Sequence, residues 1–287
     1  MARSTSRTRA ASRAAAASDT AAVSSSSSTT GLPTGRHGFR QAVRMEWIKL
    51  RSLRSTPWML LATTVGMIAI GVAAMANTKA PSPADAASFD PVNNVLAGVV
   101  LGQLVIGLMG VLAVTSEYSS GSIKSTLAAV PGRRMMLAAK AAVVGLVSLV
   151  IGEIVTFVTF FAGRMAMAAE VPHPSLGDPG VLRAVVLSGA YLAMVGVIGV
   201  GLGAAIRHSA AAIGALVGLF FVLPTLLAGL TGTTVSKFMP TWIFSSSLGV
   251  SKEVSGVLTP WAGFAVLCLY VVAALGIGGW LLTRRDA

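Results

Sequence analysis

The chain has 287 residues, of which 54% are hydrophobic and only 11% are charged, and its mean hydropathy is +0.77. About a quarter of the residues in a soluble domain carry a charge, so this composition excludes an ordinary soluble globular protein. Apolar runs of 18 or more residues recur along the chain. Because these runs are continuous rather than alternating, they predict membrane-spanning helices instead of a β-barrel. We therefore expect an all-α integral membrane protein.

The net charge of the chain is +12. In a soluble protein such a balance would suggest nucleic-acid binding. Basic residues beside membrane spans instead set the topology, so we expect no nucleic-acid partner. The single cysteine, Cys268, lies in an apolar run and cannot form a disulfide within the chain.

Residues 1–35 are rich in Ala, Ser and Thr. They lack the apolar core of about 7–15 residues that marks a secretory signal, and their composition predicts a disordered tail on the cytoplasmic side. The remainder, residues 36–287, is expected to form one transmembrane domain.

A basic amphipathic segment over residues 38–55 precedes the first apolar run. Four apolar residues recur in it at helical spacing, with basic residues around them. This pattern predicts a helix that lies in the membrane interface. The alternative, a mere cluster of positive charge before the first span, is compatible with it, and we favour the helix. The interfacial positions are Phe39, Val43, Trp47, Leu50 and Arg51.

Six membrane spans follow, and their predicted limits are 57–76, 91–115, 137–163, 179–206, 209–230 and 260–282. Four of these spans open with a capping residue and a proline: Thr56-Pro57, Asp90-Pro91, Asp178-Pro179 and Thr259-Pro260. Proline is tolerated at the first helical position because its missing N–H would have no partner there.

The distribution of Lys and Arg predicts the orientation. Of the 22 basic residues, 17 fall on the side that holds both termini and the loop between spans two and three, and 5 fall on the other side. The positive-inside rule then places both termini and the 116–137 loop in the cytoplasm.

The loop between spans two and three contains a short apolar stripe. Ile123, Leu127 and Val130 follow one another at i, i+4 and i+7, and Pro131 ends the pattern. Such a stripe fits a groove on a partner, or it packs back on the spans; the pattern alone leaves both open.

Other features of the spans also have two interpretations. Residues 238–244 are apolar but too short to span, so they form either an interfacial or re-entrant helix or an aromatic anchor at the headgroups. Gly-x-x-x-Gly pairs, which allow close helix contact, mark either packing within the chain or a dimer interface; they lie at 98–102, 199–203 and 214–218. Pro224 is expected to kink span five, as a gate hinge or as ordinary bending.

Motifs of catalysis and nucleotide binding are absent from the sequence. It has no P-loop, no His-Glu-x-x-His, no Gly-x-Ser-x-Gly and no Cys/His cluster, so we expect no catalytic, cofactor or metal site. Glu153 is the one carboxylate that lies deep within a predicted span. It either lines a pathway, with Thr156 and Thr159 on the same polar face, or makes a structural hydrogen bond.

Two motifs carry a family resemblance. From residue 117 the loop reads Glu-Tyr-x-x-Gly-Ser-Ile-Lys-x-Thr-Leu-x-x-x-Pro-x-Arg-Arg, which resembles the cytoplasmic loop of ABC-transporter permeases of the six-span exporter class. Residues 46–55 resemble the elbow helix before the first span of that family. The motifs cover a small part of the chain, and the span arrangement extends the resemblance over 38–285.

The resemblance implies a permease subunit in the cell membrane that moves a solute, most often outward, with ATP and Mg²⁺ bound by a separate cytosolic ATPase. It also implies a second permease chain, as a homodimer or a heterodimer. The coupling role falls by resemblance on Glu117, Gly121, Ile123, Lys124, Leu127, Pro131, Arg133 and Arg134. Two alternatives stay open: a membrane anchor or sensor that recruits a cytosolic partner without transport and, less favoured for want of intramembrane charges and internal repeats, a secondary transporter.

Overall fold

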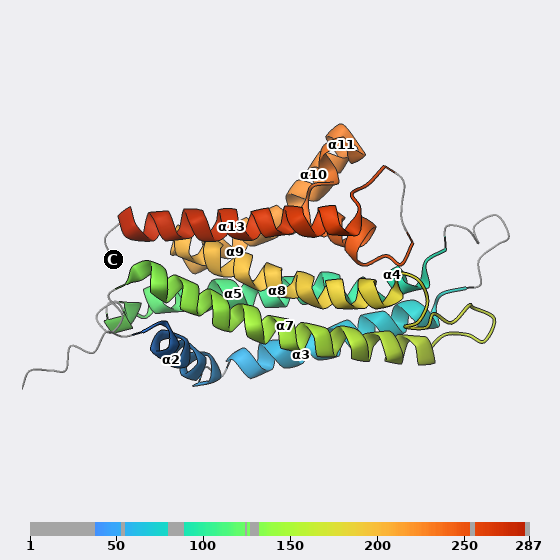
Figure 1. The fold of residues 1–287 in the computed structure, drawn as a ribbon, viewed down its shortest axis with the longest axis horizontal. Coiled ribbons are helices and arrows are strands. Elements are labelled where there is room, and N and C mark those ends of the chain that lie inside the picture. Colours follow the sequence, from blue (N-terminus) through green and yellow to red (C-terminus); the bar gives the residue numbers. More distant parts are fainter. Residues whose placement is uncertain are drawn as a thin grey trace, which may run out of the picture. The chain divides into compact units, whose positions relative to one another are not determined.

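The computed structural model describes residues 38–52, 55–79, 89–123, 125–126, 132–252 and 256–284. The predicted tail over residues 1–35 lies outside this part of the chain. The described residues form helices and no strands, as the continuous apolar runs predict (Figure 1).

Six helical segments are long and apolar enough to cross a membrane. The segments are α3 (Ser55–Ala76); α4 (Pro91–Val95), a 3₁₀ turn η1 (Leu96–Gly98) and α5 (Val99–Ser119) in succession; α7 (Arg133–Met165); α8 (Val181–Ile206); α9 (Ser209–Val217) with α10 (Leu223–Thr231); and α13 (Pro260–Arg284). Each falls close to a predicted span. The largest differences lie in α5, which continues to Ser119, and in α7, which begins four residues early at Arg133.

Helix α8 is the central helix of the bundle: it packs on α5, α7 and α13, and the four run side by side (Figure 1). Glycines bring α8 close to α5. A Cβ at Gly199 would lie 2.4 Å from the main-chain oxygen of Gly107, and one at Gly203 would lie 2.9 Å from that of Val111. Packing within the chain, one of the two interpretations of the Gly-x-x-x-Gly pairs, is therefore correct for the 199–203 pair.

The other two glycine pairs differ from each other. Gly98 lies against Met67 of α3, where an added Cβ would meet the Met67 main-chain oxygen at 2.4 Å. Around Gly214 and Gly218, in contrast, an added Cβ would meet no atom within 4 Å. The 98–102 pair thus packs within the chain, whereas the 214–218 pair is uncovered.

The proline start signals are correct at two spans and displaced at the other two, and at span one α3 already begins at Ser55, before Thr56-Pro57. Asp90 caps α4 by accepting a hydrogen bond from the Val92 N–H, with Pro91 at the first position, and Pro260 begins α13. At span four the helix begins only at Val181, because Gly180 adopts a left-handed conformation (φ 82°). The Asp178 carboxylate accepts instead from the Ser175 N–H.

Span five is interrupted at Pro224, as predicted. A π-turn, η2 (Gly218–Val222), separates α9 from α10, and Figure 1 shows α10 diverging from the bundle. Proline has no N–H to donate to the carbonyl four residues earlier, which here belongs to Phe220. The Thr241 hydroxyl donates to that carbonyl instead, so a later segment of the chain supplies the hydrogen bond that proline cannot make.

That later segment is a compact turn of α11 (Thr233–Ser236), α12 (Pro240–Ile243) and a π-turn η3 (Phe244–Leu248). Ile243 and Phe244 are buried, and the Phe244 ring stacks on Tyr191 of α8 with centroids 5.0 Å apart. The buried Phe244 favours the interfacial or re-entrant helix for this part of 238–244, whereas Phe238 is 41% exposed, as a headgroup anchor would be.

We expect Gly199→Ala to destabilise the protein by about 1–3 kcal/mol, because the new methyl group overpacks the α5–α8 contact. Gly214→Ala is the matched control: its methyl group meets open space, and Ala stabilises a helix by roughly 0.5–1 kcal/mol relative to Gly. Thermal unfolding of both purified variants measures the difference. Equal stability of the two variants would contradict the close approach of α5 and α8.

Candidate functional site

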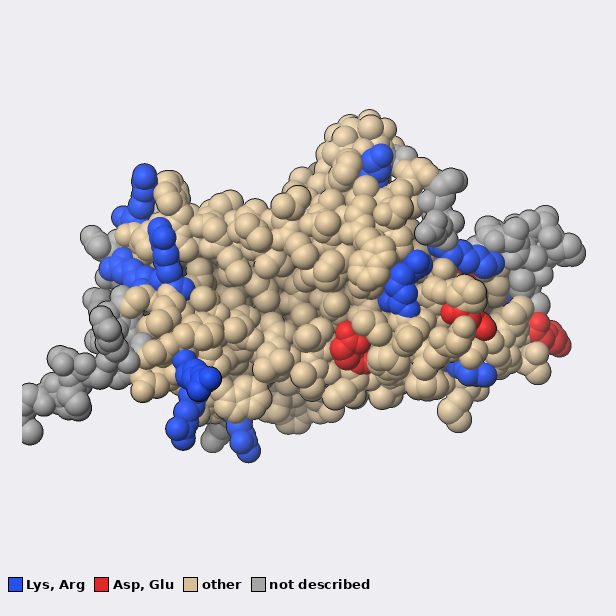
Figure 2. Space-filling view, viewed as in Figure 1, with Lys and Arg blue, Asp and Glu red and all other residues tan. Residues whose placement is uncertain are grey.

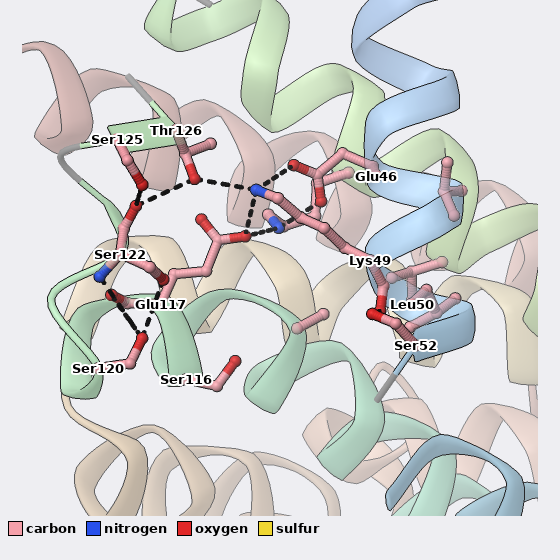
Figure 3. Close-up of a pocket in the computed structure, with 14 residues that line it drawn as sticks. Glu46, Lys49, Leu50, Ser52, Ser116, Glu117, Ser120, Ser122, Ser125 and Thr126 are labelled. Atoms are coloured by element: carbon pink, nitrogen blue, oxygen red, sulfur yellow. Dashed lines mark hydrogen bonds and ion pairs between the residues drawn. The ribbon is translucent and has the colours of Figure 1, made fainter. Parts of the chain in front are cut away.

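Four charged side chains meet at one end of the bundle, where α2 (Phe39–Ser52) packs on α7. The Lys140 ammonium contacts Glu46 Oε2 at 2.5 Å and Glu117 Oε1 at 2.7 Å. Lys49 Nζ lies 3.2 Å from Glu117 Oε1 and 3.5 Å from Glu46 Oε1. We call these four residues the charge cluster (Figure 3).

The charge cluster is buried and electrically balanced. The side chains of Glu46 and Lys140 are each 4% exposed and that of Glu117 is 10% exposed, whereas Lys49 retains 34%. Two carboxylates and two ammonium groups sum to zero charge. Charges buried this deeply are tolerated only when they are paired and hydrogen-bonded. The cluster therefore fixes the relative positions of α2, α5 and α7, the helices that supply its members.

Helical spacing places each member of the cluster. Ala42, Glu46 and Leu50 recur every four residues and form the buried face of α2. Lys140 lies two turns into α7, and Glu117 lies in the last turn of α5. The second half of α2, the last turn of α5 and the early turns of α7 thus bring opposite charges together.

The start of the loop after α5 is fastened to this cluster. Gly121 has φ 71°, the left-handed conformation that lets the chain turn away from α5. The Thr126 main-chain N–H and its hydroxyl both bond the Ser122 carbonyl, which closes a helical turn. The Thr126 oxygen in turn accepts a hydrogen bond from Lys49 Nζ at 2.9 Å. This turn is therefore tied directly to α2.

Two predicted coupling residues are placed differently from the expectation. Glu117 does not border an exposed contact, because it pairs with two lysines in the interior. Ile123 is only 4% exposed and packs in an apolar cluster with Met136 and Leu137 of α7. The burial of Ile123 favours the interpretation in which the stripe packs back on the spans, and its coupling role stays a prediction.

The remaining coupling residues lie apart. The Arg133 guanidinium donates to the Leu282 carbonyl at 2.9 Å and so joins the start of α7 to the end of α13. Arg134 is exposed. Lys124, Leu127 and Pro131 lie outside the described residues.

Helix α2 has the two faces that an interfacial helix requires. Leu50 is buried against the bundle, whereas Phe39 and Trp47 are 47% and 45% exposed. Val43 is half-buried and Arg51 is exposed. The uncovered aromatic rings give the helix an apolar side that no other described part of the chain covers, next to its exposed arginines.

Glu153 lies midway along α7, half-buried and against α8. A Cβ at Gly189 would lie 2.5 Å from the Glu153 carboxyl carbon, so glycine leaves the room that this side chain occupies. No ion pair or side-chain hydrogen bond joins the Glu153 carboxylate to another described residue. Among the described residues, Thr156 donates only to the Glu153 main chain, and the buried Thr159 hydroxyl has no partner.

The sequence reasoning missed the roles of Glu46, Lys49 and Lys140. The signal was present: Glu46 is the only acid in the basic segment before span one, and Lys140 falls within predicted span three. Opposite charges at the same end of neighbouring spans point to a buried pair, but their partners become clear only when α2 is placed beside α7.

Comparison with known families gives one match. The family described as ABC-2 family transporter protein matches residues 42–224, which include most of α2, the charge cluster and the first four spans. No curated protein matches the chain.

We expect Lys140→Met to destabilise the protein by about 3–5 kcal/mol, because it leaves two buried carboxylates with only Lys49 to balance them. Arg134→Met, an exposed position on the same helix, should change stability by less than about 0.5 kcal/mol. Adding Glu46→Gln to Lys140→Met restores the charge balance and should recover part of the loss. Unfolding of the four proteins in detergent forms the test, and a Lys140→Met variant as stable as wild type would refute the pairing.

Proposed function

Because the chain belongs to the ABC-2 transporter family, it is a multi-pass membrane permease subunit, and we propose that it exports a solute with ATP hydrolysed by a separate cytosolic subunit. Two copies of the permease with two ATPases would form the working unit, with ATP and Mg²⁺ in the ATPases. The resemblance of residues 117–134 to the family's cytoplasmic loop supports this assignment.

The observation that carries the proposal is the attachment of the loop turn to the charge cluster. A partner that pushes on the turn at Ser122–Thr126 acts through Thr126 on Lys49, and through Lys49 on Glu46 and Glu117. Those residues belong to α2 and α5, and Lys140 extends the linkage to α7. Force applied at the loop would therefore reach three helices, because separating the paired charges costs several kcal/mol.

The surface that the turn offers to an ATPase is polar. Ser119, Ser120, Ser122 and Ser125 are exposed, whereas Ile123 faces inward. We therefore place the described part of the docking surface on these serines. A hydroxyl surface fits hydrogen-bonded docking at a rim better than insertion of an apolar knob.

We propose that the α2 end of the bundle faces the cytoplasm. On the face seen in Figure 2, the charged residues near that end are Lys and Arg, whereas the rest of the face carries Asp and Glu as well as Lys and Arg. This arrangement supports the orientation that the positive-inside rule predicts.

We also propose that Glu153 lies on the solute pathway. A half-buried carboxylate in the middle of a membrane helix is costly unless it faces water, a ligand or another protein, and no described residue of its own chain pairs with it. The pathway role and contact with the second permease chain are both consistent with that position.

To test the coupling proposal, Ser125→Trp should abolish co-purification of a P-loop ATPase with the tagged full chain from its native membrane, because the indole covers the docking surface. His173→Trp, on an exposed loop at the other end of the bundle, is the matched control. Mass spectrometry of the purified complex and its ATP hydrolysis give the readout. A wild-type complex without an ATPase, or an equal yield of ATPase from both variants, would sink the proposal and favour the anchor alternative.

The orientation is tested by cysteine labelling in intact cells, in a background where Cys268 is replaced by Ala. A cysteine at Ser175 should react with an impermeant maleimide, and cysteines at Ser119 and Thr283 should react only after the cells are opened. Labelling of Ser119 from outside would reverse the topology and remove the coupling assignment with it.

A further inference from the structure

A cavity of about 360 Å³ opens beside the charge cluster (Figure 3). One part of its wall is polar, formed by the cluster and by hydroxyl groups of the loop turn and the end of α5. The other part is apolar, formed by Leu50, Ala113, Val143 and Val144. The cavity therefore has the polarity of an amphiphile site.

A second, smaller cavity extends the apolar part. It has a volume of about 90 Å³, and both cavities are lined by Leu50, Ala113 and Ser116. Its remaining lining includes Met59 and Leu112 of α3 and α5. The apolar part of the first cavity thus continues into the second one, along the contact between α3 and α5.

Hydrogen bonding shows which group the polar part lacks. Glu117 Oε1 accepts from both lysines, but Glu117 Oε2 is buried without a partner among the described residues. Figure 3 shows this free oxygen on the side of the carboxylate that faces Ser122 and Ser125. An unpaired buried carboxylate oxygen carries a desolvation cost that a donor would remove.

Three groups around that oxygen have their donors in use, whereas the Lys140 ammonium contacts only Glu46 and Glu117 among the described residues. The Ser116 hydroxyl donates to the Leu112 carbonyl at 2.6 Å, and the Ser125 hydroxyl donates to the Ser122 carbonyl at 2.7 Å. Lys49 Nζ has three donors and three partners, Glu46, Glu117 and Thr126. The cavity therefore offers more acceptors than donors, Glu117 Oε2 and the lone pairs of these hydroxyls among them, and so favours a ligand that brings donors.

We propose that this cavity binds a lipid with a primary-ammonium headgroup, of the phosphatidylethanolamine type. The ammonium donates to Glu117 Oε2 and to hydroxyl oxygens, and the first methylene groups of an acyl chain enter the adjoining apolar cavity. Because the charge cluster is already neutral, a zwitterionic head adds no net charge to the site. The exposed aromatic side of α2, typical of a helix at headgroup depth, lies on the same helix as Leu50 and Lys49.

The test is native mass spectrometry of the purified, delipidated full chain titrated with lipids of identical acyl chains. We expect phosphatidylethanolamine to bind at least about tenfold more tightly than phosphatidylcholine, because the trimethylated head has no N–H to donate to a carboxylate. Phosphatidylglycerol, which lacks an ammonium group, should bind as weakly as phosphatidylcholine. Equal affinity for the three lipids overturns the proposal.

A variant pair locates the site. Ser116→Phe fills the junction of the two cavities and should abolish the preference for phosphatidylethanolamine. Thr225→Phe is the control: its hydroxyl also bonds the carbonyl four residues earlier, but it is exposed on α10, far along the chain from the cavity. An unchanged preference in Ser116→Phe places the lipid elsewhere and overturns the assignment. The lipid comparison uses the wild-type chain, so it decides the question even if that variant does not fold.

Soluble phosphoethanolamine, which is the headgroup without acyl chains, tests how much of the binding comes from the headgroup alone. It should bind far more weakly than the lipid, because it lacks the chain that fills the apolar cavity. Binding as tight as that of the lipid would overturn the amphiphile proposal. These measurements need no ATPase, so their outcome is independent of the proposed transport function.

Discussion

Two buried carboxylates and two ammonium groups hold the α2 end of the bundle together. Each charge would be costly to bury alone, but the carboxylates and ammonium groups form ion pairs across three helices. This mutual dependence has a structural consequence for α2. Its buried Ala42 also packs in an apolar group with Met136 and Leu137 of α7, so the position of α2 depends on apolar packing together with the cluster. The loop turn depends on it as well, through the bond between Lys49 and Thr126.

The interior of the bundle is held by a different kind of contact. Along α8, glycines remove the side chains that would keep the helices apart, and the main chains of α5 and α8 approach closely. In lipid, where burying an apolar side chain gains little over leaving it among acyl chains, this close packing is a main source of helix association. The chain thus combines tight dispersion contacts in the membrane interior with ion pairs at one end.

The elements that the sequence predicted well are those fixed by local chemistry. Span number and limits follow from the length of apolar runs and from proline at helix starts, and the break at Pro224 follows from a missing donor. What the sequence could not supply is which side chains meet. The spacing of Ile123 fits a stripe that docks on a partner as well as one that packs on the spans, and the position of α7 beside Ile123 favours the second. The α8 start was misplaced because the left-handed Gly180 follows Pro179 and delays the helix. Likewise, Glu46 and Lys140 are separated by 94 residues, so their pairing is a property of the fold.

The length of α7 distinguishes it from its neighbours. With 33 residues it measures about 50 Å at 1.5 Å per residue, whereas the hydrocarbon core of a bilayer is about 30 Å thick. Even when tilted, such a rod projects beyond the hydrocarbon, and its first two turns are the ones that carry Arg133 and Lys140. The rod has no proline or glycine between Arg133 and Val144 to absorb bending. The projecting end is therefore a continuous helix as far as Gly145, and the contact of Lys140 with Glu117 joins it to the end of α5, from which the loop turn starts.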